Sequence, residues 1–284
     1  MKEPLLGAHV SSAGGMPRAV DRAVDLGVSS CQIFVKSPSQ WRGRRFSAEE
    51  VARFRRQRGR AGLLRVVAHG TYLLNLAATD PANRERSVAT LADEIERSTA
   101  LGLDGLVIHP GAHLGSGEPA GLARIARALE RVLEQRPDDT PPILLENTAG
   151  QGTVLGYRIQ QLGTIVELCP HGERLHLCLD TCHAFAAGYA IDEAGGLDEL
   201  LGEIDQHLGL GRLAVIHLND SRHRRGSRRD RHANLGAGRI GLDAFERLLF
   251  EPRLAGVPMI LETPLGKDGD GHRRDLETLR AMLS

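Results

Sequence analysis

The chain has 284 residues, enough for one large domain or two ordinary ones, and contains no serine- or proline-rich linker, so we predict one domain over residues 1–284. Its 41% hydrophobic and 25% charged residues are typical of a water-soluble globular protein, and no apolar stretch is long enough to cross a membrane. Because 36 basic residues balance 36 acidic ones, bulk charge gives no argument for a nucleic-acid partner.

Short apolar runs alternate with helical patterns along the chain. Strands are expected at residues 5–10, 31–36, 64–68, 106–108, 143–145, 175–179, 213–216 and 258–261. Helices are expected at residues 17–27, 47 to 59 or 62, 80–102, 119–135, 157–168, 193–209, 241–250 and 273–283. Pro17 and Gly27 bound the first helix, and Ser47 with Glu50 has capping-box spacing at the second. Eight strand-helix units predict an α/β fold, the (β/α)8 TIM barrel.

Candidate metal ligands follow six of the apolar runs, at intervals of 34 to 45 residues: His69, His109, Glu146, Asp180, His217 and Glu262. In a TIM barrel the C-terminal ends of the strands share one face, where the active site lies. Three more candidates stand nearby in the sequence: His183, Asp230 and His232. Asp230 and His232 are expected to point to one side of an extended loop. Five histidines and four carboxylates suit a multinuclear hydrolytic centre better than a structural zinc site, which uses more cysteine.

Other histidines and the cysteines have plainer interpretations. A lone histidine at a strand end is more often a hydrogen-bonded polar residue than a ligand, so the metal interpretation depends on all nine candidates together. His9 and His113 are expected to hydrogen-bond to the ligands, His176 lies in mid-strand, and the surface is predicted to hold His171, His207, His223 and His272. The four cysteines form no Cys-x-x-Cys pair, and Cys178 and Cys182 are expected to be buried apolar groups.

Two arginine-rich segments stand out, residues 42–60 and 222–231. Such runs are most often solvated faces, and the helical part of the first segment favours that interpretation. The second lies beside Asp230 and His232, and cations next to metal ligands indicate a polyanionic substrate such as a phosphodiester. We therefore expect Arg228 and Arg231 to contact nucleic acid. The Met1–Pro4 segment lacks the apolar core of a signal peptide, so we expect a cytoplasmic protein without a membrane partner.

Long ordered motifs resemble the endonuclease IV family of apurinic/apyrimidinic (AP) endonucleases, AP endonuclease family 2. They cover essentially the whole chain: Gly7–Val10, Ala13–Gly15, His69–Leu76, His109–His113, Leu145–Gly152, Asp180–Tyr189, His217–Ser221, Gly226–Gly241 and Leu261–Thr263. The resemblance implies a TIM barrel that hydrolyses the phosphodiester 5′ to an abasic site in duplex DNA. The products are a 3′-hydroxyl and a 5′-deoxyribose phosphate, blocked 3′ ends are also trimmed, and the role is base excision repair.

The resemblance also implies three zinc ions and no magnesium. One ion is held by His69, His109 and Glu146, and a second shares Glu146 and adds Asp180, His217 and Glu262. The third takes His183, Asp230 and His232, with Mn2+ as an alternative at that position. Zinc lowers the pKa of a bound water to about 7, so a hydroxide held between the ions bridged by Glu146 is the expected nucleophile. A monomer is expected.

The segment Ser37-Pro38-Ser39-Gln40-Trp41 departs from the family pattern. Relatives usually carry an Asn-x-Arg-Gln-Trp-like segment there, and its Arg enters the DNA base stack. Tyr72 and Leu73 match the other inserted residues and are kept, although without the resemblance both are interpreted as buried loop anchors. Candidates to replace the missing Arg are Lys36, Arg42 and Arg44.

Two other functions fit part of the pattern. Xylose-isomerase-like sugar isomerases and epimerases share metal carboxylates and histidines at strand ends, but they bind one or two ions. The set of His183, Asp230 and His232 therefore argues against them. A catalytically silent binder of damaged DNA is expected to have lost ligands, whereas all nine are present.

Overall fold

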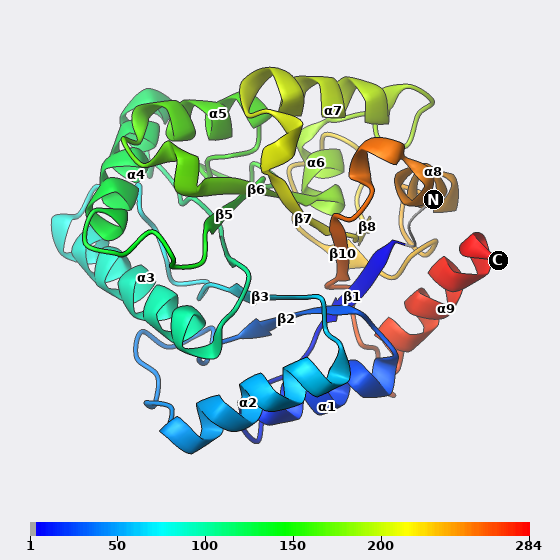
Figure 1. Cartoon of the computed structure of the whole chain (residues 1–284). Coiled ribbons are helices and arrows are strands. Elements are labelled where there is room, and N and C mark those ends of the chain that lie inside the picture. The colour runs from blue at the N-terminus through cyan, green and yellow to red at the C-terminus, as the bar shows by residue number, and fades with distance from the viewer. Residues whose placement is uncertain (1–3) are drawn as a thin grey trace.

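The computed structural model describes residues 4–284, and most of the Met1–Pro4 segment lies outside them. A closed barrel of parallel strands forms the centre, as predicted, with strand order β1-β10-β7-β6-β5-β4-β3-β2 (Figure 1). Its strands are β1 (Leu5–His9), β2 (Ser30–Phe34), β3 (Arg65–His69), β4 (Leu106–Ile108), β5 (Ile143–Glu146), β6 (Leu175–Asp180), β7 (Leu213–His217) and β10 (Pro258–Leu261). A barrel closed in this way leaves no unpaired edge among these strands.

Helices surround the barrel, and their ends follow the local sequence signals. They are α1 (Met16–Leu26), α2 (Ala48–Ala61), α3 (Pro81–Leu101), α4 (Glu118–Leu133), α5 (Ile159–Leu168), α7 (Gly196–His207), α8 (Leu242–Phe250) and α9 (Gly271–Leu283). The Ser47 hydroxyl accepts a hydrogen bond from the backbone of Glu50, and Asp80 caps α3 in the same way. Gly27, Gly62 and Gly102 end three helices in the left-handed conformation that glycine tolerates best. The predicted helices are therefore confirmed within a few residues.

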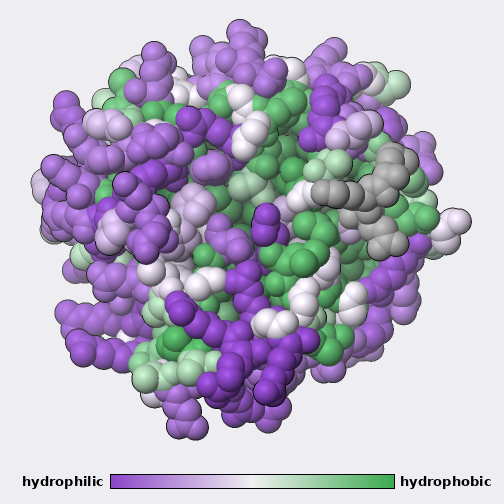
Figure 2. Space-filling model, in the orientation of Figure 1, coloured by the Kyte–Doolittle hydropathy of each residue, from purple (hydrophilic) through white to green (hydrophobic). Residues whose placement is uncertain are grey.

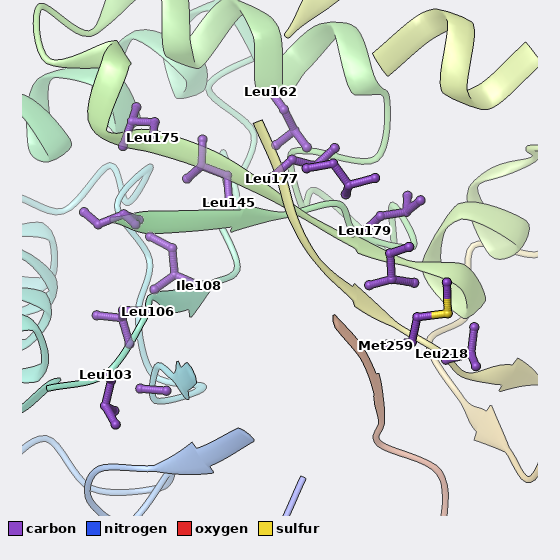
Figure 3. Packing of buried hydrophobic residues seen from close by; sticks show 14 of the residues in the cluster. Leu103, Leu106, Ile108, Leu145, Leu162, Leu175, Leu177, Leu179, Leu218 and Met259 are labelled. Carbon is purple, nitrogen blue, oxygen red and sulfur yellow. The ribbon is translucent and has the colours of Figure 1, made fainter. Parts of the chain in front are cut away.

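Two hydrophobic layers hold the barrel. The larger one lies between strands and helices and includes Ile108, Leu145 and Leu177 (Figure 3). A smaller cluster comes from six strands: Val67, Val107, Leu144, Cys178, Val215 and Ile260. Because side chains alternate along a strand, the two clusters occupy opposite faces of the same sheet. The small cluster fills the barrel and forms a floor beneath the ends of its strands.

Three elements were not anticipated. Helix α6 (Thr181–Ala187) starts directly at the end of β6, where the sequence suggested only a strand end. Strands β8 (Asp220–Ser221) and β9 (His232–Ala233) form an antiparallel pair in the segment that follows β7. In the described residues no helix is long and apolar enough to cross a membrane. Hydrophilic side chains cover much of the rim of the face in Figure 2, with hydrophobic ones gathered nearer its centre.

Candidate metal centre

The six strand-end candidates lie one layer above the floor of the barrel. Each stands two residues after a floor residue on its own strand, as His69 follows Val67 and Glu146 follows Leu144. Since strand side chains alternate with a period of two, the candidates point to the same side as the floor, into the mouth of the barrel. The parallel register brings Asp180 opposite His217 on neighbouring strands. Backbone geometry alone therefore makes these side chains converge.

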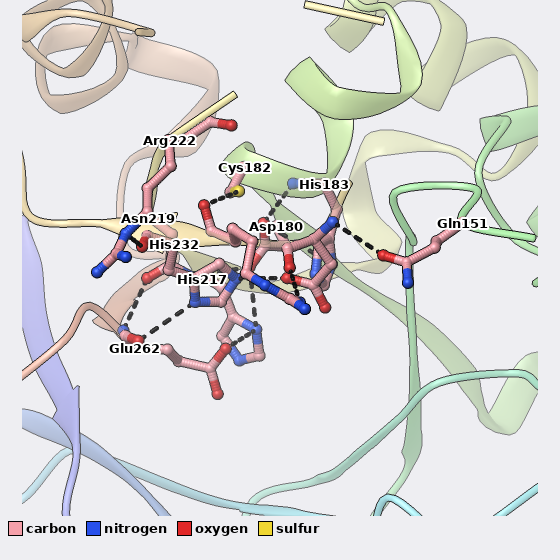
Figure 4. A network of polar contacts seen from close by, with 12 residues as sticks. Gln151, Asp180, Cys182, His183, His217, Asn219, Arg222, His232 and Glu262 are labelled. Atoms are coloured by element: carbon pink, nitrogen blue, oxygen red, sulfur yellow. Dashed lines mark hydrogen bonds and ion pairs between the residues drawn. The ribbon is translucent and has the colours of Figure 1, made fainter. Parts of the chain in front are cut away.

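Three groups of ligand atoms result, each with its atoms within 4.8 Å of one another. They are His69 with His109 and Glu146; Glu146 with Asp180, His217 and Glu262; and His183 with Asp230 and His232. Helix α6 supplies His183, and the β8–β9 hairpin supplies His232. All nine sequence-predicted candidates are thus brought together, with Glu146 shared by two groups. Several of them appear in the network of Figure 4.

Glu146 is the centre of the arrangement. Its carboxylate is fully buried and lies within 3.3 Å of four imidazoles, those of His69, His109, His183 and His217. Burial alone would raise the pKa of Glu146, but the neighbouring imidazoles of His109 and His217 outweigh it and hold the pKa well below its usual range. The group therefore stays ionised and is available to bind cations on both oxygens.

The pKa values of two neighbouring imidazoles shift in the opposite direction, upward. Burial would lower the pKa of both His183 and His217, yet each is raised well above 6.5. The carboxylates Asp180, Asp230 and Glu146 raise the pKa of His183, and Cys178 together with Glu262 and Glu146 raises that of His217. Buried positive charge is therefore favoured at this place. Either protons or metal ions can supply that charge, and the two compete for the same nitrogen atoms.

Hydrogen bonds from the far side of each ring fix which nitrogen faces the cluster. Nδ1 of His69 lies 2.8 Å from the Gly70 carbonyl, and Nδ1 of His232 lies 3.2 Å from that of Glu262, so Nε2 is left for a ligand in both. His217 is turned the other way, because its Nε2 lies 2.9 Å from Oε1 of Gln32. Such partners orient metal-binding histidines in proteins generally.

The donors fit zinc or a similar divalent ion. They are imidazole nitrogens and carboxylate oxygens, the mixture that catalytic zinc sites use. His232 Nε2 is buried and has no hydrogen-bond partner among the described residues, as expected of an atom placed for an ion. A further geometric group pairs Cys182 with Asp180 and His232. Burial raises the pKa of the Cys182 thiol to about 12, and it donates to the Arg231 carbonyl, which disfavours it as a ligand.

Supporting residues include several that the sequence interpretation missed. Gln32 on β2 donates to Glu262 Oε1 at 2.6 Å in addition to holding His217. Asn219 donates to Asp180 Oδ2 at 2.7 Å, and Asn147 pairs with the backbone of the same residue. Asn147 directly follows Glu146, and Asn219 lies two residues after His217, so closeness to a ligand was the available signal. Gln32 carried none.

The two histidines expected to support the ligands differ. His9 lies 3.1 Å from Glu262 Oε1, at the place predicted for it. His113 instead accepts a hydrogen bond from the Gly117 backbone at the start of α4. The surface assignment of His272 is wrong, because this ring is buried and lies 2.9 Å from the Thr263 carbonyl.

The rim of the centre holds the predicted DNA-contacting residues. Tyr72 is 66% exposed and stands edge-on against the rings of Phe34 and His69, while Leu73 beside it is half-buried. Interpreting Tyr72 as a buried anchor is therefore wrong. Arg228 and Arg231 are exposed, and Arg228 lies over the Tyr157 ring at 4.9 Å.

Of the three candidates to replace the family's inserted Arg, two are held by contacts within the protein. Lys36 cannot enter a base stack, because its side chain is buried and its Nζ lies 3.1 Å from Glu94 Oε1. Arg44 donates to both carboxylate oxygens of Glu50, which holds it against the protein. Arg42 is exposed, and no ion pair to it occurs in the described residues.

Comparisons with known proteins agree with this geometry. The family described as "Xylose isomerase-like TIM barrel" matches residues 20–282. "Probable endonuclease 4" of Chloroflexus aurantiacus is 48% identical over 280 residues, covering 99% of this chain and 98% of the relative. The protein of the same name from Geobacter sulfurreducens is 44% identical over 278 residues, with coverage of 98% and 94%.

Solved structures extend the likeness. The crystal structure of endonuclease IV from Thermus thermophilus superposes with a TM-score of 0.87 at 41% identity, covering 99% of both chains. A D-tagatose 3-epimerase-like protein superposes with a TM-score of 0.75 at 21% identity, covering 100% of this chain and 97% of the other. At that identity the second likeness shows the fold alone.

Proposed function

The chain belongs to the endonuclease IV family of AP endonucleases, metal-dependent enzymes that cleave DNA during repair, and from this premise we propose its detailed activity. It hydrolyses the phosphodiester 5′ to an abasic site in duplex DNA, leaving a 3′-hydroxyl and a 5′-deoxyribose phosphate. It also trims blocked 3′ ends, in base excision repair. It acts as a monomer of one domain over residues 1–284, with three bound zinc ions, or manganese at the third position.

One observation carries the proposal: three groups of ligand atoms lie together at the mouth of the barrel, and two of them share the carboxylate Glu146. The residues that would hold the ions are His69 with His109 and Glu146, then Glu146 with Asp180, His217 and Glu262, then His183 with Asp230 and His232. Zinc in such a site supplies positive charge for a phosphodiester and makes water a stronger acid. The rest of the chemistry depends on how the chain places these groups.

The chain's own residues orient the site and admit the substrate. Gln32 and His9 hold the Glu262 carboxylate, and Asn219 holds that of Asp180, so neither can turn away. Preorganised charge of this kind costs no reorganisation during reaction. Tyr72 and Leu73, at the rim, enter the duplex beside the abasic nucleotide, and Arg228 and Arg231 contact its phosphates.

A sugar isomerase or epimerase is the alternative, because such enzymes share this barrel. The group of His183, Asp230 and His232 favours the nuclease, because an epimerase site binds one or two ions and does not require a third group of ligands. Those three residues also come from α6 and the β8–β9 hairpin rather than from the barrel strands that the folds have in common.

The test combines metal analysis with cleavage by the purified protein. Three zinc ions per chain and incision of a duplex with one abasic site, but not of an intact duplex, are expected. The fragment ends should be a 3′-hydroxyl and a 5′-deoxyribose phosphate. Epimerisation of a ketose panel without incision would instead support the alternative, and neither activity with a full metal complement would reject both.

A further inference from the structure

We propose that a hollow on the flank of the barrel, separate from the metal centre, binds a backbone phosphate of the DNA duplex; this rests on the proposed function. The hollow has a volume of about 630 Å³ and lies between the segment that follows β2 and helix α3. Its charged and aromatic lining consists of Trp41, Arg42, Arg45, Arg86, Asp93 and Arg97.

The lining carries an excess of positive charge. Asp93, its one acidic member, accepts a hydrogen bond from Arg97 Nε at 2.7 Å, so this pair is neutral. Arg42, Arg45 and Arg86 have no ion pair and no side-chain hydrogen bond within residues 4–284. Three uncompensated guanidinium groups around one hollow repel one another, and an anion bound among them relieves that repulsion.

The hollow is rigidly built. The buried Arg97 donates to the carbonyls of Arg44 at 2.6 Å and Gly43 at 3.1 Å, which ties the segment to α3. A Cβ at Gly43 would come within 2.7 Å of that of Lys36, so the backbone is packed too closely there for a side chain. The Arg86 guanidinium lies over the Trp41 ring at 5.4 Å. The backbone around the hollow is therefore fixed before a ligand binds, and the ordering cost is confined to the exposed arginine side chains.

The guanidinium groups of the lining favour a phosphate as the ligand, and the place of the hollow favours a phosphate of the duplex backbone. A guanidinium presents paired donors that match phosphate oxygens. The segment that lines the hollow also contains Pro38, whose carbonyl accepts a hydrogen bond from the Tyr72 backbone at 3.1 Å. The segment that lines the hollow therefore also borders the rim at Tyr72, and the proposal places the hollow along the path of a duplex that extends beyond the lesion. Free phosphate shares the chemistry and is the other source to be tested.

The experiment uses the triple variant R42Q/R45Q/R86Q. Its matched control is R56Q/R60Q/R127Q, which removes three exposed arginines outside the hollow. Affinity for abasic and intact duplexes is measured against salt concentration. Losing one phosphate contact should reduce the slope of log affinity against log salt by about 0.9. The control variant should keep the parent's slope. The variant R42K/R45K/R86K retains the positive charges and should recover most of the slope that the glutamine variant loses.

Equal slopes for the parent and the glutamine triple variant would overturn the inference. So would saturable binding of inorganic phosphate to the parent, lost in that variant, with duplex affinity unchanged, because the ligand is then a free anion. These outcomes are distinct from failure of the proposed function, which would appear as no incision of abasic duplex by the parent. Binding to intact duplex does not require incision, so the two results are independent.

Discussion

At the scale of single residues, Glu146 joins two ligand groups while lying fully buried among imidazoles. A buried carboxylate in contact with neutral rings alone would take up a proton, so its low pKa depends on positive charge nearby. A substitution that removes the charge of Glu146 and keeps its shape separates this electrostatic role from packing.

We expect Glu146→Gln to reduce abasic-site incision by orders of magnitude while duplex affinity stays close to the parent's. The amide carries no charge and bridges two cations poorly, whereas the rim residues are untouched. Single-turnover incision and binding assays measure the two effects. Glu85→Gln, at an exposed carboxylate paired with Arg131, is the control. Near-normal turnover of Glu146→Gln would exclude a bridging role.

Tyr72 and Leu73 should carry more of the DNA distortion here than in relatives with the inserted Arg, because Ser39 cannot fill a gap in the base stack. Unstacking costs a few kcal/mol per step, so Tyr72→Ala and Leu73→Ala should weaken discrimination of abasic from intact duplex more than the rate at saturation. Ser39→Arg should improve discrimination. Val24→Ala, at another exposed hydrophobic residue, is the control. If Tyr72→Ala, Leu73→Ala and Ser39→Arg all discriminate abasic from intact duplex as the parent does, another element extrudes the abasic nucleotide.

At the scale of elements, the buried pair Lys36–Glu94 connects the segments after β2 and β3. Lys36 Nζ donates to the Gln40 carbonyl at 2.9 Å, and Glu94 Oε1 accepts from the Thr71 backbone at 3.0 Å. The Thr71 hydroxyl also donates to the Pro38 carbonyl. Helix α3 thereby holds the Tyr72 segment against the Ser39 segment through charges that are 1% exposed.

Removing both charges should separate loop placement from stability. Lys36→Met or Glu94→Leu alone leaves a buried charge unpaired, which costs about 3–5 kcal/mol. The double variant should recover the melting temperature but still discriminate abasic duplex less well than the parent, since both loop anchors are gone. R131M/E85L, at an exposed pair, is the matched control. A double variant that matches the parent in both measurements would show that the pair does not position the loops.

At the scale of the whole molecule, the candidate metal ligands come from most of the barrel strands, from α6 and from the β8–β9 hairpin. Ions bound there would connect segments that are far apart in the sequence. Their binding free energy would therefore contribute to the stability of the entire barrel.

Chelation should consequently be slow and should lower stability as well as activity. Brief EDTA treatment is expected to leave much of the incision activity, and prolonged or heated chelation to abolish it. The melting temperature should then fall by roughly 10 °C or more, since each kcal/mol shifts it by about 2–4 °C in a protein of this size. Zinc should restore both properties. A requirement for added magnesium would contradict three bound zinc ions.

The pH dependence of stability should differ in form between the metal-free and the zinc-loaded protein. The raised pKa values of His183 and His217 stabilise the metal-free fold below pH 6.5, and this contribution is lost as the pH rises through the raised values. Zinc requires deprotonated imidazoles, so the loaded protein keeps its stability over the same range. The gap between the two melting temperatures should widen above pH 6.5. A constant gap would contradict the assignment of both rings as ligands.

Much of this architecture was present in local sequence signals. Ser47 and Asp80 cap helices through hydrogen bonds to residues two or three positions away, and the apolar runs mark strands because the barrel buries both faces. The residue after each of six runs then had to lie at the strand end. Its convergence with the others followed from strand alternation and the closed parallel sheet, and the family motifs supported the same positions.

Tertiary structure decided what depends on distant contacts. The burial of Lys36 follows from Glu94, which is far away in the sequence, and that of His272 from packing near Thr263. The orientation of His217 depends on Gln32, an amide in mid-strand with no local pattern to mark it. Helix α6 could not be inferred from its few residues, because a helix this short is stable only through its contacts. Local propensity determines elements, whereas burial and hydrogen-bond partners arise only once the barrel has closed.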